Sequence, residues 1–226
     1  MVEDAIKKLE SQVEALFTLT LNAFVRFRFL RPMLDNKKLL DRIEQENKAD
    51  GFNRLRNWLY WALILELAKL CHDNGKQKRA PSIYAIREKL KNPELVQALE
   101  DKYAKNNREM AESEELRKEF RTICTRFCEN ADRMLSEAVA GGYKTIRDKL
   151  IAHNELRKDG KFHDVKDEKL KYGDERKLLT TVSELVTDLE LLVRNTDVQS
   201  VWSSTVRFDQ EMVCDFWDLN DASNPK

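Results

Sequence analysis

The chain has 226 residues, which is enough for one well-buried core but tight for two. Its 40 basic and 40 acidic side chains cancel, which argues against a protein that coats bulk polyanions, although a local basic cleft remains compatible with this balance. Only six glycines and four prolines are present, and sheets need turns that these residues supply, so the composition argues against all-β and doubly wound α/β folds.

The first half of the chain predicts helices. Apolar residues recur at helical spacing from Ile6 to Phe27, and we expect Pro32 to end or kink that helix. A shorter charged amphipathic helix should follow over residues 33–48. The next stripe, over residues 52–73, has apolar side chains around much of its circumference, which is typical of a central helix. Two short helices should follow over residues 81–107, the second capped by Asn92-Pro93.

The second half predicts a long helix over about residues 109–140. Its apolar stripe consists of Leu116, Phe120, Ile123, Phe127, Ala131, Met134 and Ala138. We expect Gly141-Gly142 to break this helix and a new helix to span about residues 143–156. A densely charged, solvated connection should occupy residues 155–177, and the last strong helix should begin near Asp174.

The fold class predicted from these elements is all-α, a single up-and-down helical bundle with extra helices. We assign residues 1–198 to the bundle. Residues 199–226 form an aromatic C-terminal extension, which either packs as an extra helix or binds a partner.

Membrane insertion is not expected. The N-terminus mixes charged and apolar residues in helical alternation, unlike a signal peptide. The longest apolar run, residues 58–71, carries Glu66 and Lys69 and is shorter than the ~20 residues that cross a bilayer. We therefore expect a cytoplasmic protein without membrane contact.

Cysteine spacing gives no sign of a metal centre. The four cysteines form no CxxC pair, so neither a zinc site nor a dense disulfide framework is indicated. Cys124 and Cys128 are four residues apart and could share a helix face as metal ligands, but the neighbouring Phe120 and Phe127 favour buried structural thiols. We expect no metal and no cofactor.

One stretch, residues 143–154, carries residues suited to phosphate chemistry. It holds Arg147 and His153, with Lys144 and Lys149 close by in sequence. Histidine can give and take a proton near neutral pH, and arginine offers a planar fork of donors to a phosphoryl group. Such a pair can cleave RNA without a metal, because the ribose 2′-hydroxyl supplies the nucleophile. In an arbitrary protein, however, a histidine of this kind is a surface or packing residue.

Helical geometry limits what one copy of this pair can do. Six residues at 100° each place His153 about 120° around a helix from Arg147, so the two side chains lie on neighbouring faces. Two copies packed about a two-fold axis would build a more compact site. The motif therefore favours a homodimer.

The stretch Arg147-Asp148-Lys149-Leu150-Ile151-Ala152-His153-Asn154 resembles the Arg-x4–6-His signature of the HEPN superfamily, most closely its AbiU-type abortive-infection branch. The order of helices over residues 1–198 is similar too. This resemblance implies a helical bundle, a homodimer with facing motif helices, and metal-independent RNA cleavage in active members. It implies that Arg147 and His153 are the catalytic pair and that Asp148 orients one of them.

Four further residues near the implied cleft are candidates for binding RNA phosphates: Lys144, Lys149, Asn154 and Arg157. The predicted function is an endoribonuclease of the phage-defence or toxin type, with RNA as substrate and an antitoxin or sensor protein as a possible partner. Two alternatives remain open. One is a catalytically inactive HEPN dimer that binds RNA, a nucleotide or a partner protein, and the other is a purely structural interaction protein.

Overall fold

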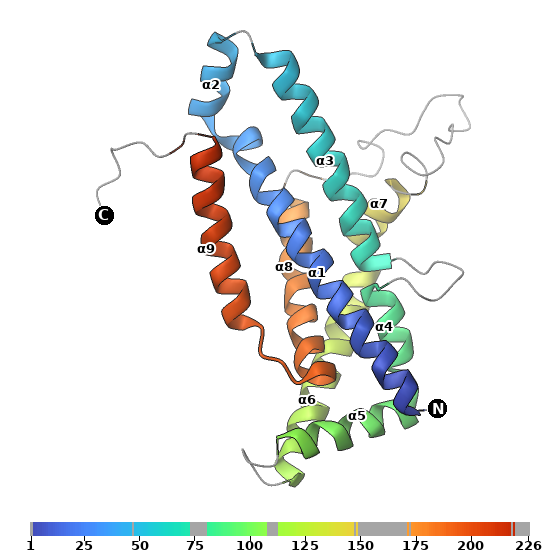
Figure 1. Cartoon of the computed structure of the whole chain (residues 1–226). Helices are drawn as coiled ribbons and strands as arrows, with labels where there is room; N and C mark the ends of the chain where they lie inside the picture. The colour runs from blue at the N-terminus through green and yellow to red at the C-terminus, as the bar shows by residue number, and fades with distance from the viewer. Residues whose placement is uncertain are drawn as a thin grey trace, which may run out of the picture. The chain divides into compact units, whose positions relative to one another are not determined.

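The computed structural model describes residues 2–46, 48–72, 81–107, 113–146, 148, 171, 173–217 and 219. Every regular element within these ranges is a helix, as Figure 1 shows. The predicted all-α class is confirmed for this part of the chain. No helix among the described residues combines the length and the apolar character needed to cross a bilayer.

The described part of the chain forms ten helical elements. Their bounds are α1 (Val2–Asp35), α2 (Lys37–Gln45), α3 (Ala49–His72), α4 (Ile83–Lys89), α5 (Pro93–Asn106), α6 (Ser113–Ser136), α7 (Ala138–Ile146), α8 (Asp174–Leu189), a π-helix η3 (Glu190–Arg194) and α9 (Gln199–Phe216). The predicted cap is confirmed, because the Asn92 side chain accepts a hydrogen bond from the Glu94 amide at 2.9 Å and Pro93 begins α5.

The chain divides into two compact units. Unit 1 comprises Met1–Leu21 and Ile64–Val198, and unit 2 comprises Asn22–Leu63 and Gln199–Lys226. Two long helices, α1 and α3, each contribute one part to unit 1 and the other part to unit 2. The segment after Val198 forms α9, which belongs to unit 2.

Unit 1 is organised around α6. This helix contacts α4, α5, α7, α8 and η3. Its apolar stripe is buried from Leu116 to Met134, with Phe127 and Ala131 fully excluded from solvent. Burying an apolar side chain of leucine or phenylalanine size stabilises a fold by about 1.5–3 kcal/mol. The stripe therefore fixes α6 as the helix against which the rest of unit 1 packs.

Ion pairs add directionality to the packing of unit 1. The carboxylate of Glu100, on α5, accepts hydrogen bonds from Arg121 at 2.7 Å and from Arg117 at 3.4 Å, both on α6. Arg126 of α6 donates two hydrogen bonds to the Asp188 carboxylate of α8, at 3.1 and 2.5 Å. Because Glu100 and Asp188 are buried, these pairs specify which faces of the helices meet.

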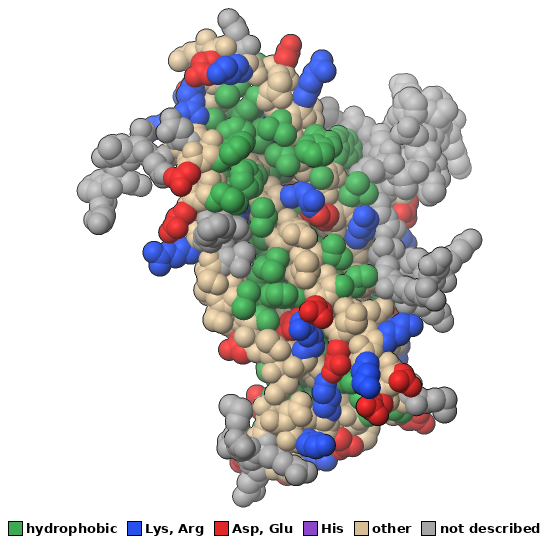
Figure 2. Space-filling view, viewed as in Figure 1, with side chains coloured by type: hydrophobic (Ala, Val, Ile, Leu, Met, Phe, Trp, Pro, Cys, Tyr) green, Lys and Arg blue, Asp and Glu red, His purple; other side chains and the backbone are tan. Residues whose placement is uncertain are grey.

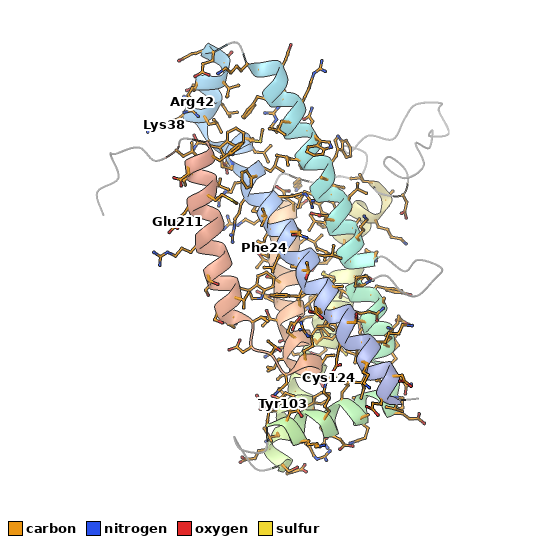
Figure 3. The ribbon with its side chains drawn as sticks, in the orientation of Figure 1. Phe24, Lys38, Arg42, Tyr103, Cys124 and Glu211 are labelled. Carbon is orange, nitrogen blue, oxygen red and sulfur yellow. The ribbon has the colours of Figure 1, made fainter. Side chains whose placement is uncertain are left out.

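Unit 2 closes around an aromatic core. Trp217, just after α9, meets the edge of Phe52 on α3, with ring centroids 5.8 Å apart. Arg42 of α2, labelled in Figure 3, donates a hydrogen bond to the Trp217 carbonyl at 2.5 Å. The fully buried Met33 and Leu39 belong to the same cluster. These contacts explain why the aromatic C-terminal segment folds as a helix of this unit.

The first half of α3 does not have the buried environment that its apolar pattern predicted. Trp58 is 69% exposed and Leu55 is 38% exposed, whereas Leu63, Leu67 and Leu70 are fully buried. Figure 2 shows apolar side chains gathered on the viewed face of unit 2. The prediction of a central helix therefore holds only for the second half of α3.

One predicted helix boundary is wrong. The long helix breaks at Glu137, not at Gly141-Gly142, and both glycines lie inside α7. The break shifts the phase of the buried face so that Tyr143 and Ile146 become fully buried. At Pro32, where we expected α1 to end or kink, the helix does not end but continues to Asp35, and Leu30 and Met33 are fully buried on either side of the proline.

Candidate functional site

The candidate site begins at the C-terminal end of α7. This helix contacts α6 and α8 within unit 1. Three of its side chains anchor it, Ala140, Tyr143 and Ile146, each at most 1% exposed. The Thr145 hydroxyl donates a hydrogen bond to the Gly141 carbonyl, one helical turn earlier, at 3.0 Å. The helix that leads into the motif is thus fixed by packing on both neighbours.

Two of the predicted site residues lie among the described residues. Lys144 is half-buried in the last turn of α7, where the helix dipole favours a positive charge. Asp148 is also half-buried. The motif arginine, Arg147, directly follows the last residue of α7 in sequence, but it lies outside the described residues, and so do Lys149, His153, Asn154 and Arg157.

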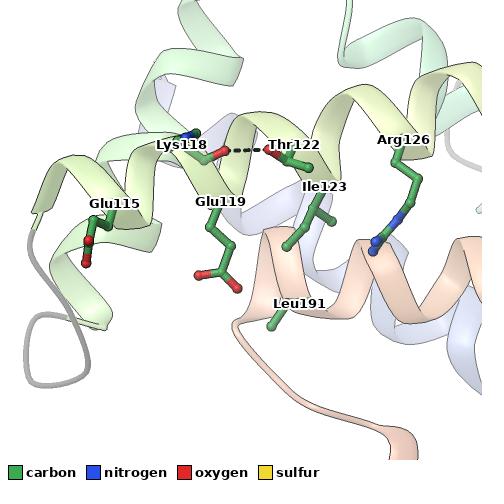
Figure 4. Close-up of a pocket in the computed structure, with 7 residues that line it drawn as sticks. All are labelled: Glu115, Lys118, Glu119, Thr122, Ile123, Arg126 and Leu191. Carbon is green, nitrogen blue, oxygen red and sulfur yellow. Dashed lines mark hydrogen bonds between the residues drawn. The ribbon is translucent and has the colours of Figure 1, made fainter.

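A groove on the described part of unit 1 carries none of the predicted site residues. It has a volume of about 600 Å³ and lies between α6 and η3. Figure 4 shows Glu119, Ile123 and Arg126 directed from α6 toward the helix that bears Leu191. Its charges are mixed, and Arg126 is already held by Asp188. A groove of this kind does not suit a polyanion, because no net positive charge faces into it.

Burial changes the acid–base behaviour of several groups in unit 1. Desolvation raises the pKa of the Cys71 thiol to about 12, so this fully buried thiol stays protonated at neutral pH. Burial also raises the pKa of Tyr103 to about 12, with Glu119 adding to the shift, and burial lowers the pKa of Lys89. None of these groups lies in the motif, and each behaves as a packed structural residue.

No group of three or more histidine, cysteine, aspartate or glutamate side chains within the described ranges is arranged to hold a metal ion. The ion pairs of Arg126 with Asp188 and of Arg121 with Glu100 were not singled out from the sequence. Their partners lie 62 and 21 residues apart, and no local pattern connects residues at such separations. Only the packing of α6 against α5 and α8 brings them together.

A protein-family model described as AbiU2, of the HEPN superfamily, matches residues 6–212. The chain belongs to the AbiU2 family of HEPN proteins. The predicted family resemblance is thereby confirmed, and the AbiU2 match extends into α9. No curated protein and no solved structure matches the chain.

AbiU2 membership bears on the motif because the match spans all of it. Residues 143–157, which include every predicted site residue, lie well inside the matched range of 6–212. In this AbiU2 chain, the motif sequence starts at the end of a helix whose Tyr143 and Ile146 are buried. A functional side chain is positioned best when the element that carries it is itself fixed by packing.

Proposed function

We propose that this AbiU2-family protein is a metal-independent endoribonuclease. The observation that carries this proposal is the coincidence of the family match with the sequence Arg147-Asp148-x4-His153, which starts directly after the anchored helix α7. The burial of Tyr143 and Ile146 supports it, because a site for phosphoryl transfer needs a rigid base.

The chemistry assigned to the pair requires no external nucleophile. The ribose 2′-hydroxyl attacks the adjacent phosphorus, the bond from phosphorus to the 5′-oxygen breaks, and a 2′,3′-cyclic phosphate and a 5′-hydroxyl remain. His153 takes up the proton of the attacking hydroxyl or supplies one to the leaving oxygen. The Arg147 guanidinium stabilises the negative charge that builds on the phosphoryl oxygens in the transition state.

Asp148 serves as a positioning residue in this scheme, since a carboxylate can orient a guanidinium or an imidazole through a charge-assisted hydrogen bond. Lys144, Lys149, Asn154 and Arg157 hold the RNA backbone by its phosphates. Lys144 supplies a fixed positive charge three residues before Arg147, at the end of α7. We propose that a second copy of the chain completes the site, because a helix through residues 147–153 would place Arg147 and His153 on neighbouring faces.

The proposed role is in abortive infection, in which RNA cleavage arrests a phage-infected cell. An antitoxin or sensor protein would restrain such an activity in the uninfected cell. RNA is the proposed substrate class, and the protein is proposed to act in the cytoplasm.

The test is RNA cleavage in the presence of EDTA. Pools of intact tRNA, rRNA and mRNA are incubated with the wild-type protein and with His153→Ala, Arg147→Ala and His163→Ala, the last being a matched histidine control outside the motif. We expect the wild type and His163→Ala to leave cyclic phosphate ends. We expect a loss of about 10²–10⁴-fold for His153→Ala and about 10²–10³-fold for Arg147→Ala.

Circular dichroism of each variant confirms that the helices are retained. Cleavage that persists in His153→Ala would contradict the proposed mechanism. If the wild type binds RNA but never cleaves it, the protein is an RNA-binding module and not an endoribonuclease.

A further inference from the structure

The exposed tryptophan of α3 is a feature that the proposed function does not use. Trp58 is 69% exposed and lies in the part of α3 that belongs to unit 2. Each of the other three tryptophans packs on an aromatic ring, with centroids 5.6–6.4 Å apart: Trp61 on Tyr60, Trp202 on Phe24 and Trp217 on Phe52. In the described part of the chain, no aromatic ring packs on the Trp58 indole. The fold therefore leaves this indole available to a ligand.

Two arginines on the same stretch of α3 keep their charges available. Arg54 is exposed one helical turn before Trp58, and Arg56 is half-buried. Among the described residues, neither guanidinium has a hydrogen-bond or ion-pair partner. The part of α3 in unit 2 carries one acidic residue, Asp50, against these two arginines. This stretch of the helix is therefore positively charged around an open indole.

The helical spacing places a cation, an amide and an indole on one face. Asn57 and Trp58 follow Arg54 by three and four residues, and side chains at these spacings have Cβ atoms ~5–6 Å apart. Asn57 is exposed as well. An arginine can bind a phosphate, an amide can hydrogen-bond a base edge, and an indole can stack on the flat side of a base. All three groups lie within one turn of α3.

The charge distribution of unit 2 favours a nucleic-acid strand over a second copy of the chain. The segment Asn22–Leu63 has nine basic and five acidic residues, whereas the acidic excess of unit 2 lies in Gln199–Lys226. A two-fold contact through α3 would bring the same positively charged face of two copies together, and like charges oppose such a contact. A single strand supplies negative phosphates and unpaired bases, which match the arginine and the indole.

We propose that the face of α3 formed by Arg54, Asn57 and Trp58 is a binding site for single-stranded RNA. A base stacks on the Trp58 indole, and Arg54 contacts a backbone phosphate. The proposal rests on the proposed endoribonuclease function, which makes RNA the ligand. Every base has a flat face, so the site holds a strand without selecting its sequence. Bases inside a duplex are already stacked on one another and do not reach the indole.

The test measures binding with a probe that the proposed chemistry cannot cleave. A fluorescein-labelled 2′-O-methyl oligouridylate has no free 2′-hydroxyl to act as the nucleophile. A length of about ten nucleotides lies within the site sizes of known single-strand binders. The anisotropy of this probe is followed as full-length protein is added, and a 2′-O-methyl duplex of the same length serves as the comparison. A wild type that does not bind the single strand would overturn the proposal.

Substitutions of Trp58 test the stacking contact. We expect Trp58→Ala to weaken single-strand binding by about fivefold to a hundredfold and to leave duplex binding unchanged. Trp58→Phe keeps a ring and should recover most of the affinity, whereas Trp58→Leu is apolar without a ring and should not. Because Trp58 is mostly exposed, all three variants should unfold at the wild-type temperature. An unchanged affinity in Trp58→Ala, an equal loss on the duplex, or a Trp58→Leu as tight as Trp58→Phe would overturn the proposal.

Salt dependence tests the phosphate contact separately. For a single strand, each phosphate contact adds about 0.7 to the slope of log affinity against log salt concentration. Arg54→Gln should therefore lower the slope by about 0.7, whereas Trp58→Ala should leave it unchanged. The matched control is Arg31→Gln, which removes the same charge from unit 2 at an arginine already paired with Asp35 at 3.4 Å, and it should not change the slope. Equal slopes for Arg54→Gln and the wild type would overturn the proposal.

The outcomes distinguish this site from the proposed function. A wild type that binds the probe through Trp58 but never cleaves RNA would retain the site and refute the endoribonuclease. A wild type that cleaves RNA in EDTA but binds the probe independently of Trp58 would refute the site and retain the endoribonuclease. Sedimentation of Trp58→Ala checks the other occupant of this face. A shift from dimer to monomer would identify an interface between copies and would overturn the RNA site.

Discussion

Unit 1 and unit 2 are both built from helices, but different contacts hold them together. In unit 1, buried carboxylates receive fixed partners: Glu190 is bound by Arg194 at 3.0 and 3.1 Å, and Asp188 by Arg126. In unit 2, the contacts are aromatic, with Phe216 meeting both Phe29 and Trp217 edge-on.

The difference shows what each kind of contact can specify. A buried ion pair costs desolvation energy and tolerates only one partner geometry, so it fixes which helix faces meet. Aromatic contacts depend mostly on buried area, and their preference for edge-on or offset geometry is worth only about 0.5–1.5 kcal/mol per pair. Consistent with this, Phe216 and Trp58 remain more than half exposed in unit 2, while the helix that leads to the motif lies in unit 1.

The largest loss of stability should come from removing the partner of a buried charge in unit 1. Glu190 is fully buried, and Arg194→Met removes its ion pair, which we expect to lower the free energy of unfolding by about 3–5 kcal/mol at pH 7. Burial already raises the pKa of Glu190, and Arg194 opposes that shift, so the variant raises it further. Denaturant unfolding of the variant and the wild type measures the loss.

The pH dependence of this loss has a defined sign. A glutamate carboxyl whose pKa is higher in the folded state than in the unfolded state (~4.3) favours folding when it is protonated. This contribution is complete when the pH is below the unfolded-state pKa, and it is lost as the pH rises through the folded-state pKa. The loss in Arg194→Met should therefore shrink as the pH falls from 7 toward 4.5. In the control, Arg194→Met combined with Glu190→Gln, this recovery should be absent. An equal loss at every pH would show that Glu190 is not the group responsible.

A smaller loss of stability should come from removing a helix cap, and each unit offers one such cap. Asn92 caps α5 in unit 1, and Asn36 caps α2 in unit 2 by accepting a hydrogen bond from the Leu39 amide at 3.0 Å. We expect Asn92→Ala and Asn36→Ala each to reduce stability by about 1 kcal/mol, because a cap is a local contact. Hydrogen exchange of the α5 and α2 amides measures each loss separately. A much larger loss at Asn92 would mean that the buried pairs of unit 1 depend on this cap.

The smallest effect should be that of Trp58→Ser. This side chain is 69% exposed, so we expect stability to change by no more than about 0.5 kcal/mol. Thermal unfolding followed by circular dichroism checks this, with Trp217→Ser as the buried counterpart that should be strongly destabilising. A substantial loss in Trp58→Ser would mean that the exposed face of unit 2 is covered in solution.

The sequence predicted the helices better than their surroundings. The stripe from Leu116 to Met134 on α6 and the Asn92-Pro93 cap depend on residues within a few turns, and both were confirmed. The exposure of Trp58 was not foreseen, because periodicity shows which residues share a face but not whether another helix covers it. The break at Glu137 was missed because burial of Tyr143 and Ile146, not the glycines, sets the direction of α7.

At the candidate site, too, local features could be predicted from the sequence and contacts between distant residues could not. The motif from Arg147 to His153 could be found from residue types and spacing, and the family to which it pointed is confirmed. The ion pair of Arg87 with Asp132 could not, because Arg87 lies on another helix and 45 residues separate it from Asp132. The roles of Arg147 and His153 stay predictions, since both residues lie outside the described part of the chain.

We propose that two copies of the chain share one RNA-cleaving pocket, and a mixed dimer distinguishes a shared pocket from two independent ones. Arg147→Ala and His153→Ala chains carrying different tags are co-expressed, and dimers that contain one of each are isolated through both tags. We expect the mixed dimer to regain RNA cleavage in EDTA, whereas dimers of either variant alone should not cleave, because the mixed pocket keeps one arginine and one histidine. An inactive mixed dimer beside an active wild type, or a wild type that is active as a monomer, would contradict it.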